Sequence, residues 1–441
     1  MEIKTYNHPD RASWGAIQQR SELDVSALFE AVQSVINDIK KGGDEAVRRY
    51  GERYDNVYVT ELQVSEDEII EAETLLSDEL KQAILQAYRN IEKFHASQQF
   101  EGNKVETMTG VTCWQKAVAI EKVGLYIPGG TAPLFSTVLM LAVPAKIAGC
   151  QEIVLCTPPN REGKVHPAIL FAAKVSGVGK IYKVGGIQAI AAMTYGTESI
   201  PKVFKIFGPG NQYVVAAKQL VSLTDVAIDM PAGPSEVEII ADETANPAFI
   251  ASDFLSQAEH GVDSQSVLVT TSESLVEVVK KEIERQLTIL PRCHFIEQSL
   301  AHSRIVILKD NDEIIEFTNQ YAPEHLIIQT VDYNDISNRI INAGSVFLGA
   351  YTPESAGDYA SGTNHTLPTK GYSKMYSGVN VDSFIKKITF QEITKQGLEL
   401  LGPTIEIMAE AEHLEAHKNA VSLRLESILL STIKNLSVLN I

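Results

Sequence analysis

The sequence predicts an α/β protein with two doubly wound, Rossmann-like parallel-sheet domains, a helical N-terminal region and a C-terminal helical arm. Two features of its 441 residues lead to this fold class. From residue 123 onward, short apolar strands alternate with alanine-rich helical segments at roughly 30-residue spacing, which is typical of parallel sheets with right-handed crossovers. A second series of the same kind begins at residue 237, so two such units are expected.

The first part of the chain is expected to be helical, because apolar residues between 26 and 97 recur at helical spacing. No residue of this part suggests chemistry. The α/β unit that follows is expected to contain strands at 124–127, 153–156, 181–184 and 203–207 and helices at 137–147, 166–174 and 189–195.

The second α/β unit contains the clearest helix boundaries. Asn246 and Pro247 predict an N-cap and a first helical position, and Gly261 is expected just beyond the end of that helix. The other elements expected here are strands at 237–240, 266–269, 303–307, 326–329 and 345–348 and a helix at 275–286. A glycine- and serine-rich stretch then precedes a helical tail from residue 402, in which the run 405–430 predicts one long final helix that serves as an arm for a partner chain.

Composition excludes several classes of function. The 38 lysines and arginines and 56 aspartates and glutamates give a net charge of −18, which repels nucleic acid. The 4 cysteines form no C-x-x-C pair, so neither a disulfide scaffold nor a cysteine zinc ribbon is expected. The most apolar window, 132–150, is too short and interrupted to span a membrane. With no secretory leader at its start, we expect a cytoplasmic protein with free thiols and no membrane partner.

Glycine-rich turns follow three of the strands in the first α/β unit. They are Pro128-Gly129-Gly130, Gly185-Gly186 and Gly208-Pro209-Gly210-Asn211. Such turns let phosphates approach backbone N–H groups at a helix start. None matches G-x-G-x-x-G or a Walker A loop, and any one alone is better explained as a tight turn. Three at strand ends favour a nucleotide-like ligand.

Two short segments of the second unit suggest proton transfer and metal binding. Glu324 and His325 place a carboxylate beside an imidazole just before a strand, where they could act as an acid/base pair. Gln257 and His260 are three residues apart and project from one face near the end of a helix. A solvated surface remains an alternative for each pair taken alone.

Further polar groups occur toward the C-terminus. Asp358 and His365 lie in a loop rich in glycine and polar residues, which is more typical of a site than of packing. His413 and His417, at i and i+4 of the tail, would share a helix face and resemble a two-histidine metal pair, although chance pairing is a serious alternative. With Gln257 and His260, these ligands would suit zinc without any cysteine.

Several long motifs, in order along nearly the whole chain, resemble the histidinol dehydrogenase family. They are Gly124-Leu125-Tyr126-Ile127-Pro128-Gly129-Gly130, Phe207-Gly208-Pro209-Gly210-Asn211, Asp229-Met230-Pro231-Ala232-Gly233-Pro234-Ser235-Glu236, Ser256-Gln257-Ala258-Glu259-His260-Gly261, Pro323-Glu324-His325-Leu326 and Ala416-His417-Lys418-Asn419-Ala420. The resemblance implies a zinc- and NAD-dependent homodimer with shared active sites and one zinc ion per subunit. It implies oxidation of L-histidinol through L-histidinal to L-histidine with two NAD, the final step of histidine biosynthesis.

The resemblance also implies roles for individual residues. The zinc ligands would be Gln257, His260, Asp358 and His417, the acid/base pair Glu324 and His325, and the NAD contacts Tyr126, Gln188 and Asn211. The substrate contacts would be Ser235, Gln257, His260, His325, Asp358, His365, Glu412 and His417. The tail with Glu412 and His417 would come from the partner subunit, and His413 would have no role. Zinc is not distinguished from manganese or cobalt.

Domain boundaries are expected as follows. Residues 1–22 would be an N-terminal arm, 23–121 with 233–378 the α/β domain carrying most of the zinc and catalytic residues, 122–232 the NAD-binding α/β domain, and 379–441 the helical dimerisation arm that completes the partner's site.

Water and a thiolate are alternative nucleophiles for the second oxidation. Water activated by Glu324 is favoured over Cys113, Cys150 or Cys156, since Cys150 and Cys156 flank an apolar strand and none has an identified base beside it. Two rival functions are a dehydrogenase for another small polar alcohol and a non-catalytic, zinc-stabilised dimer or ligand-binding protein. The Glu324-His325 pair disfavours the second rival, because metal binding requires neither residue.

Overall fold

The computed structural model describes residues 3–20, 25–129, 132–231 and 233–438. Backbone contacts divide the chain into two compact units, residues 1–99 with 119–384 and residues 100–118 with 385–441. Gly130 and Ala232 of the motifs above, and residues 1–2 and 21–22 of the expected N-terminal arm, lie outside the described residues.

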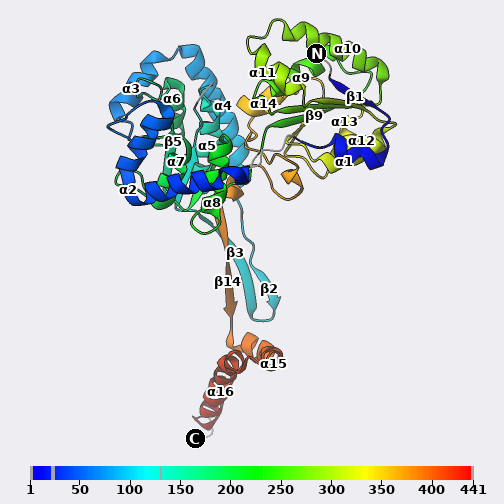
Figure 1. Ribbon diagram of the computed structural model, residues 1–441. Coiled ribbons are helices and arrows are strands. Elements are labelled where there is room, and N and C mark those ends of the chain that lie inside the picture. Colours follow the sequence, from blue (N-terminus) through cyan, green and yellow to red (C-terminus); the bar gives the residue numbers. More distant parts are fainter. Residues whose placement is uncertain (1–2, 21–24, 130–131, 232, 439–441) are drawn as a thin grey trace. The chain divides into compact units, whose positions relative to one another are not determined.

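A parallel sheet of six strands, counted among the described residues, carries the second α/β unit (Figure 1). Its strand order is β1-β11-β10-β9-β12-β13. The bounds are β1 (Lys4–Asn7), β9 (Glu236–Ala241), β10 (Gln265–Thr270), β11 (Arg304–Ile307), β12 (His325–Gln329) and β13 (Ser345–Leu348). The sequence pattern does not predict β1, because this short, mostly exposed strand becomes regular only by pairing with β11.

Both faces of the six-stranded sheet are apolar, as expected for a parallel sheet between two helix layers. In β9, Ile239 packs in one core cluster and Ile240 in the other. The first cluster contains α9 (Pro247–Ala258), α10 (Glu273–Leu287) and α11 (Cys293–Leu300), and the second contains α1 (Trp14–Ile17), α12 (Asn311–Tyr321) and α13 (Tyr333–Ser337). The predicted α/β architecture with parallel sheets is therefore confirmed.

A second parallel sheet has five described strands in the order β6-β5-β4-β7-β8. These are β4 (Lys122–Tyr126), β5 (Glu152–Thr157), β6 (Lys180–Lys183), β7 (Lys205–Phe207) and β8 (Ala227–Ile228). One face packs on α4 (Asp78–Ala96), α5 (Phe135–Ala148) and α6 (Pro167–Ser176), and the other on α2 (Phe29–Asp55), α7 (Gly186–Tyr195) and α8 (Gln212–Ser222). The order reverses between β4 and β7, which is where doubly wound sheets bind nucleotides.

The N-terminal helices pack chiefly on this five-stranded sheet. The apolar stripe of α2 meets α7 and α8, α3 (Glu66–Leu75) meets α6, and α4 meets α5. The domain boundaries expected from the sequence instead group residues 23–121 with 233–378. Helical periodicity identifies a buried face but not the sheet that buries it, so this pairing could not be derived from the pattern.

The second compact unit, residues 100–118 with 385–441, combines a small sheet with two helices. Its strands are β2 (Val105–Met108), β3 (Val111–Ala119) and β14 (Ile385–Ile393), and its helices are α15 (Lys395–Ala411) and α16 (Glu415–Val438). None of these three strands was predicted. The side chains of β2 and β14 are largely exposed and those of β3 are mostly half-buried. These strands therefore lack the buried alternating pattern that marks a strand.

The prediction of one long final helix is wrong. α15 begins at Lys395 and ends at Ala411, and α16 starts at Glu415. Between them His413 has φ 59°, a left-handed conformation that interrupts the helical hydrogen bonds. His413 therefore shares no helix with His417, and the i, i+4 histidine pair does not form. Among the described helices, none has the length and apolar character to cross a membrane.

Candidate active site

The metal-binding and acid/base candidates Gln257, Glu324 and His325 lie at the amino ends of β9 and β12 in the six-stranded sheet. Ser235 directly precedes β9, Glu324 directly precedes β12, and His325 pairs with Val237 in the register of these neighbouring strands. Because α9 runs back from the carboxyl end of β9 to the amino end of β10, its last turn with Gln257 lies at the same edge. Ligands of open α/β sheets usually bind at the carboxyl ends, so strand order alone would have pointed to the wrong edge.

The boundaries of α9 explain the position of Gln257. The side chain of Asn246 accepts a hydrogen bond from the Ala248 N–H at 2.9 Å and Pro247 begins the helix, as predicted. The helix ends at a right-handed Glu259 cap rather than at a left-handed glycine, so the expectation for Gly261 is wrong. A right-handed turn that His260 continues needs no residue with positive φ.

The two acid/base candidates are buried side by side. Glu324 is 5% and His325 4% exposed. Glu324 Oε2 accepts a hydrogen bond from the Glu236 N–H at 2.9 Å and lies 3.8 Å from His325 Nδ1. Burial raises the pKa of Glu324 to about 8, although the charge of His325 opposes this.

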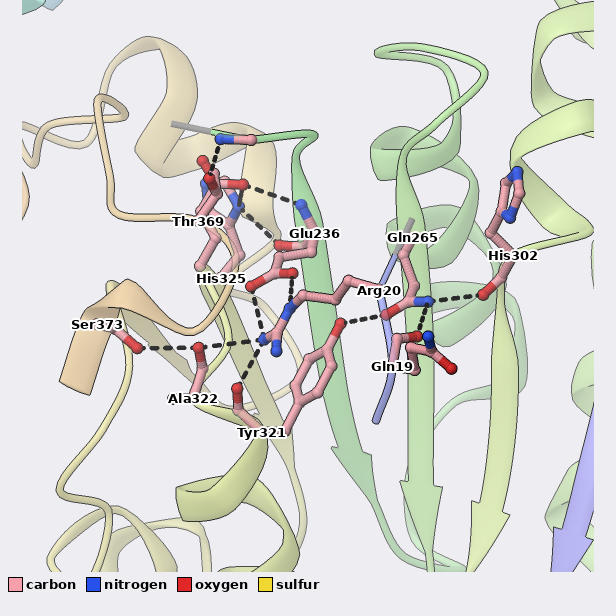
Figure 2. A network of polar contacts seen from close by, with 12 residues as sticks. Gln19, Arg20, Glu236, Gln265, His302, Tyr321, Ala322, His325, Thr369 and Ser373 are labelled. Atoms are coloured by element: carbon pink, nitrogen blue, oxygen red, sulfur yellow. Dashed lines mark hydrogen bonds and ion pairs between the residues drawn. The ribbon is translucent and has the colours of Figure 1, made fainter. Parts of the chain in front are cut away.

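The orientation of His325 leaves one ring nitrogen for chemistry. Its Nδ1 is 3.3 Å from the Glu236 carbonyl oxygen (Figure 2). Nε2 has no hydrogen-bond partner among the described residues and lies 3.5 Å from Asp358 Oδ1. This geometry favours the tautomer with the proton on Nδ1, because Nδ1 then donates to the carbonyl oxygen. Burial lowers the pKa of His325, but Glu354, Glu324 and Asp358 together raise it to about 10.

A set of possible metal-binding groups lies close to His325. His260 Nε2 lies 3.9 Å from Asp358 Oδ2, and one donor atom each of His260, Glu354 and Asp358 lies within 4.8 Å of the others. Gln257 is fully buried, and neither its Oε1 nor its Nε2 has a partner among the described residues. An unpartnered buried amide is costly, so this group indicates a missing ligand.

Glu354 was not identified from the sequence. It begins α14 (Glu354–Tyr359), is 1% exposed, and its Oε1 lies 3.7 Å from His325 Nδ1. Burial raises its pKa to about 8, and neither carboxylate oxygen has a hydrogen-bond partner within the described ranges. Its i, i+4 spacing from Asp358 on one helix face was a signal that could have found it.

His365 is brought to the same place. Its Nδ1 lies 2.9 Å from the Asp358 carbonyl oxygen and its Nε2 3.1 Å from the Thr137 hydroxyl of α5. Ser235 is half-buried at the start of β9. His365 therefore lies beside Asp358 and Ser235 beside Glu236, and their contact with a substrate stays a prediction.

The expected NAD contacts lie at the strand ends of the five-stranded sheet. The Tyr126 hydroxyl at the end of β4 accepts a hydrogen bond from the Gly186 N–H at 3.1 Å. Asn211 Oδ1 accepts from the Tyr213 and Val214 N–H groups and caps α8. Gln188 differs, because it is fully buried and its Nε2 donates to Asp55 Oδ2 at 3.1 Å. In this conformation its side chain does not face a ligand.

Glu412 and His417 belong to the second unit. Glu412 is the C-cap residue of α15, and His417 lies in the first turn of α16. Both are exposed.

Two parallel α/β sheets and a buried imidazole flanked by carboxylates define an enzyme of the α/β class. The model of the histidinol dehydrogenase family matches residues 18–425. The chain belongs to the histidinol dehydrogenase family, and it is therefore a dehydrogenase.

Individual relatives agree with this assignment. A histidinol dehydrogenase of Bacteroides fragilis is 66% identical over 426 residues, which cover 97% of this chain and 100% of the relative. The histidinol dehydrogenase of Escherichia coli K12 is 52% identical over 404 residues, which cover 91% and 92%. The crystal structure of histidinol dehydrogenase from Elizabethkingia anophelis superposes with a TM-score of 0.95 at 56% identity and covers 97% of this chain and 98% of that one.

Proposed function

We propose that this chain oxidises L-histidinol to L-histidinal and then to L-histidine with two NAD, as the final step of histidine biosynthesis. The observation that carries the proposal is the convergence of Gln257, His260, Asp358 and Glu324-His325 at the amino ends of β9 and β12. Family membership indicates histidinol as the substrate. The site contains groups that can accept protons, Glu324 and His325, next to residues that can bind a metal ion.

The residues present fit a zinc ion. Gln257 is buried with an unpartnered amide, and His260 and Asp358 lie close together. Amide oxygen, imidazole and carboxylate are donors that zinc accepts. We propose that Gln257, His260 and Asp358, with His417 of the partner subunit, hold one zinc per subunit. Zinc would orient the nitrogens of the substrate and stabilise charge on it.

His325 is proposed to accept the hydroxyl proton of histidinol at Nε2 while hydride leaves the carbinol carbon. NAD, when bound, supplies the hydride acceptor in each of the two oxidations. The Glu236 carbonyl fixes the proton on Nδ1, which leaves the Nε2 lone pair to act as a base. A dication beside Asp358 would disfavour a positive charge on His325 and lower its pKa from the high value that the carboxylates alone produce.

Glu324 is proposed to take a proton from water that adds to the aldehyde. After His325 has released its first proton to solvent, it takes a hydroxyl proton from the hydrate as the second hydride leaves. The product is the carboxylic acid, which ionises to the carboxylate. Burial raises the pKa of the Cys150 thiol to about 12 and raises that of Cys156 as well. Protonated thiols are poor nucleophiles, so water is favoured over a thiolate.

The five-stranded sheet is proposed to bind NAD through its strand-end turns. Tyr126 and Asn211 lie at these turns. Gln188 would have to leave Asp55 to make its expected contact. In this proposal the NAD-binding domain comprises residues 122–232. Most of the other site residues lie in residues 233–378, and the arm comprises residues 379–441.

A homodimer with shared sites is part of the proposal. Strand β14 and helices α15 and α16 expose many large apolar side chains, which a partner subunit would cover. They include Ile388, Phe390, Leu400, Ile407, Met408, Leu423, Leu429, Leu430 and Ile433. Glu412 would contact the substrate of the partner's site, as would the partner's own Ser235 and His365.

The test is the yield of NADH per histidinol on zinc-loaded protein. About two NADH per substrate, with histidine as the product, is expected for two successive two-electron oxidations. No NADH would favour a non-catalytic dimer, and NADH only with a different small polar alcohol would favour a related dehydrogenase.

A further inference from the structure

We infer that Arg20 and Glu236 form a clamp that positions Glu324 and His325 for proton transfer. The clamp is the pair of side chains together with the hydrogen bonds between them. The inference rests on the proposed function, because it assigns a role to residues that act through the proposed acid/base pair.

The main chain of Glu236 contacts both members of the pair. Its N–H donates to Glu324 Oε2 at 2.9 Å, and its carbonyl oxygen lies 3.3 Å from His325 Nδ1. One peptide segment therefore fixes the carboxylate of Glu324 and the tautomer of His325. A shift of this segment would move both groups at once.

Arg20 holds the side chain of Glu236 at this place. Glu236 is 2% exposed, and Arg20 Nη2 donates to its Oε1 at 2.8 Å while Arg20 Nε donates to its Oε2. Two parallel bonds to one carboxylate fix orientation as well as distance. Figure 2 shows the guanidinium group between the Glu236 carboxylate and the carbonyl groups of the neighbouring chain segment.

Arg20 also binds the chain segment at Tyr321 and Ala322, which precedes Glu324 and His325. Its Nη2 donates to the Tyr321 carbonyl at 2.6 Å and to the Ala322 carbonyl at 3.4 Å. Ala322 has φ 55°, which is an uncommon conformation for alanine and needs support from its surroundings. Ser373 provides a further bond to the same carbonyl at 2.9 Å.

The position of Arg20 is itself fixed by packing. Its guanidinium carbon lies 3.9 Å from the centre of the Tyr321 ring, and the Tyr321 hydroxyl donates to Gln265 Oε1 at 2.7 Å. Arg20 thus joins the chain entering β9 to the chain entering β12. Lysine cannot reproduce this, because it lacks the planar fork that binds two acceptors in fixed directions.

Arg20→Lys and Arg20→Met test the clamp in zinc-loaded protein, with rates per zinc-containing site. The expected result is a fall of about tenfold to a hundredfold in kcat, because small displacements of catalytic groups have effects of this size. KM for histidinol and NAD should change less than about twofold, because the substitution does not alter interactions that bind the ground state and the transition state equally. The kinetic isotope effect with deuterium on the carbinol carbon should rise as chemistry becomes slower.

Arg11→Met is the matched control. Arg11 also belongs to the N-terminal segment, pairs with Glu316 of α12 at 2.7 Å and lies over the Trp14 ring, but it is exposed. This variant should keep the wild-type kcat. If Arg20→Met does not fold, Arg20→Lys decides, because it keeps the charge beside Glu236.

An unchanged kcat with only a lower Tm would overturn the inference and leave Arg20 a purely structural residue. A raised KM at constant kcat would also overturn it. Failure of the wild-type protein to reduce NAD with histidinol would instead refute the proposed function, so the two failures are distinguishable.

Discussion

Replacement of Asp253 by asparagine is expected to remove a pH-dependent loss of stability. Asp253 lies in α9, one turn before Gln257, and is 5% exposed. Its Oδ2 accepts a hydrogen bond from Gln329 Nε2 at 2.8 Å. Burial raises its pKa from 3.8 to about 7, and this hydrogen bond opposes the shift only in part.

The sign follows from proton binding. A carboxyl group with a higher pKa in the folded state binds more protons when folded, so stability falls as the pH rises. The fall begins near 3.8 and is complete above about 7. A shift of about three pH units corresponds to about 4 kcal/mol in full, of which about 2–3 kcal/mol arises between pH 5 and pH 8.

The assay is urea unfolding of the metal-free protein in chelator, followed by circular dichroism between about pH 5 and pH 8. Asparagine cannot ionise but still accepts from Gln329. The stability of Asp253→Asn relative to wild type should therefore grow by about 2–3 kcal/mol across this range. Asp335→Asn, which alters an exposed carboxylate on α13, should show no such growth. A stability difference for Asp253→Asn that stays constant with pH would exclude Asp253 as the source of the pH dependence.

Four further predictions concern the site. His325→Asn should keep its zinc but lose about 10²- to 10⁴-fold in turnover, and a wild-type rate in steady-state assays would remove His325 as the base. Glu324→Gln should slow oxidation of histidinal more than that of histidinol in single-turnover experiments, and equal slowing would count against water activation. Gln257→Leu should lower the zinc content measured by atomic absorption, and an unchanged zinc content in the variant would exclude Gln257 as a ligand. Chelation of the wild-type protein should abolish its activity, and added zinc should restore it. Gly208→Ala should raise KM for NAD and lower Tm, because Gly208 has φ 123° and a Cβ would lie 2.0 Å from the Tyr126 carbonyl oxygen; an unchanged KM would separate this turn from NAD binding.

The sequence predicted the parallel sheets well, because their strands are buried on both faces and read as apolar runs. In β9 and β12 nearly every side chain is buried. The strands β1, β2, β3, β8 and β14 were missed for the opposite reason. They are short, exposed or only half-buried, so no apolar run marks them.

The site could be predicted in part. Gln257 and Glu324 stood out through residue type and spacing, and the family resemblance then implied a role for each. Glu354 was missed although its i, i+4 spacing from Asp358 marks it. Arg20 was missed because its contacts are with residues far away in sequence. Arg20 contacts Glu236 across 216 positions, and no periodicity reports such a contact. The break at His413 was missed because its left-handed conformation has no clear marker in the local sequence.

We propose that each active site is assembled from two subunits around a divalent cation. Co-expression of His260→Ala and His417→Ala chains with different affinity tags allows purification of the mixed dimer. In a shared site, this dimer holds one intact site and one doubly altered site, so we predict about half of the wild-type activity and zinc content. A mixed dimer as inactive as either parent variant would exclude a site shared between the two subunits.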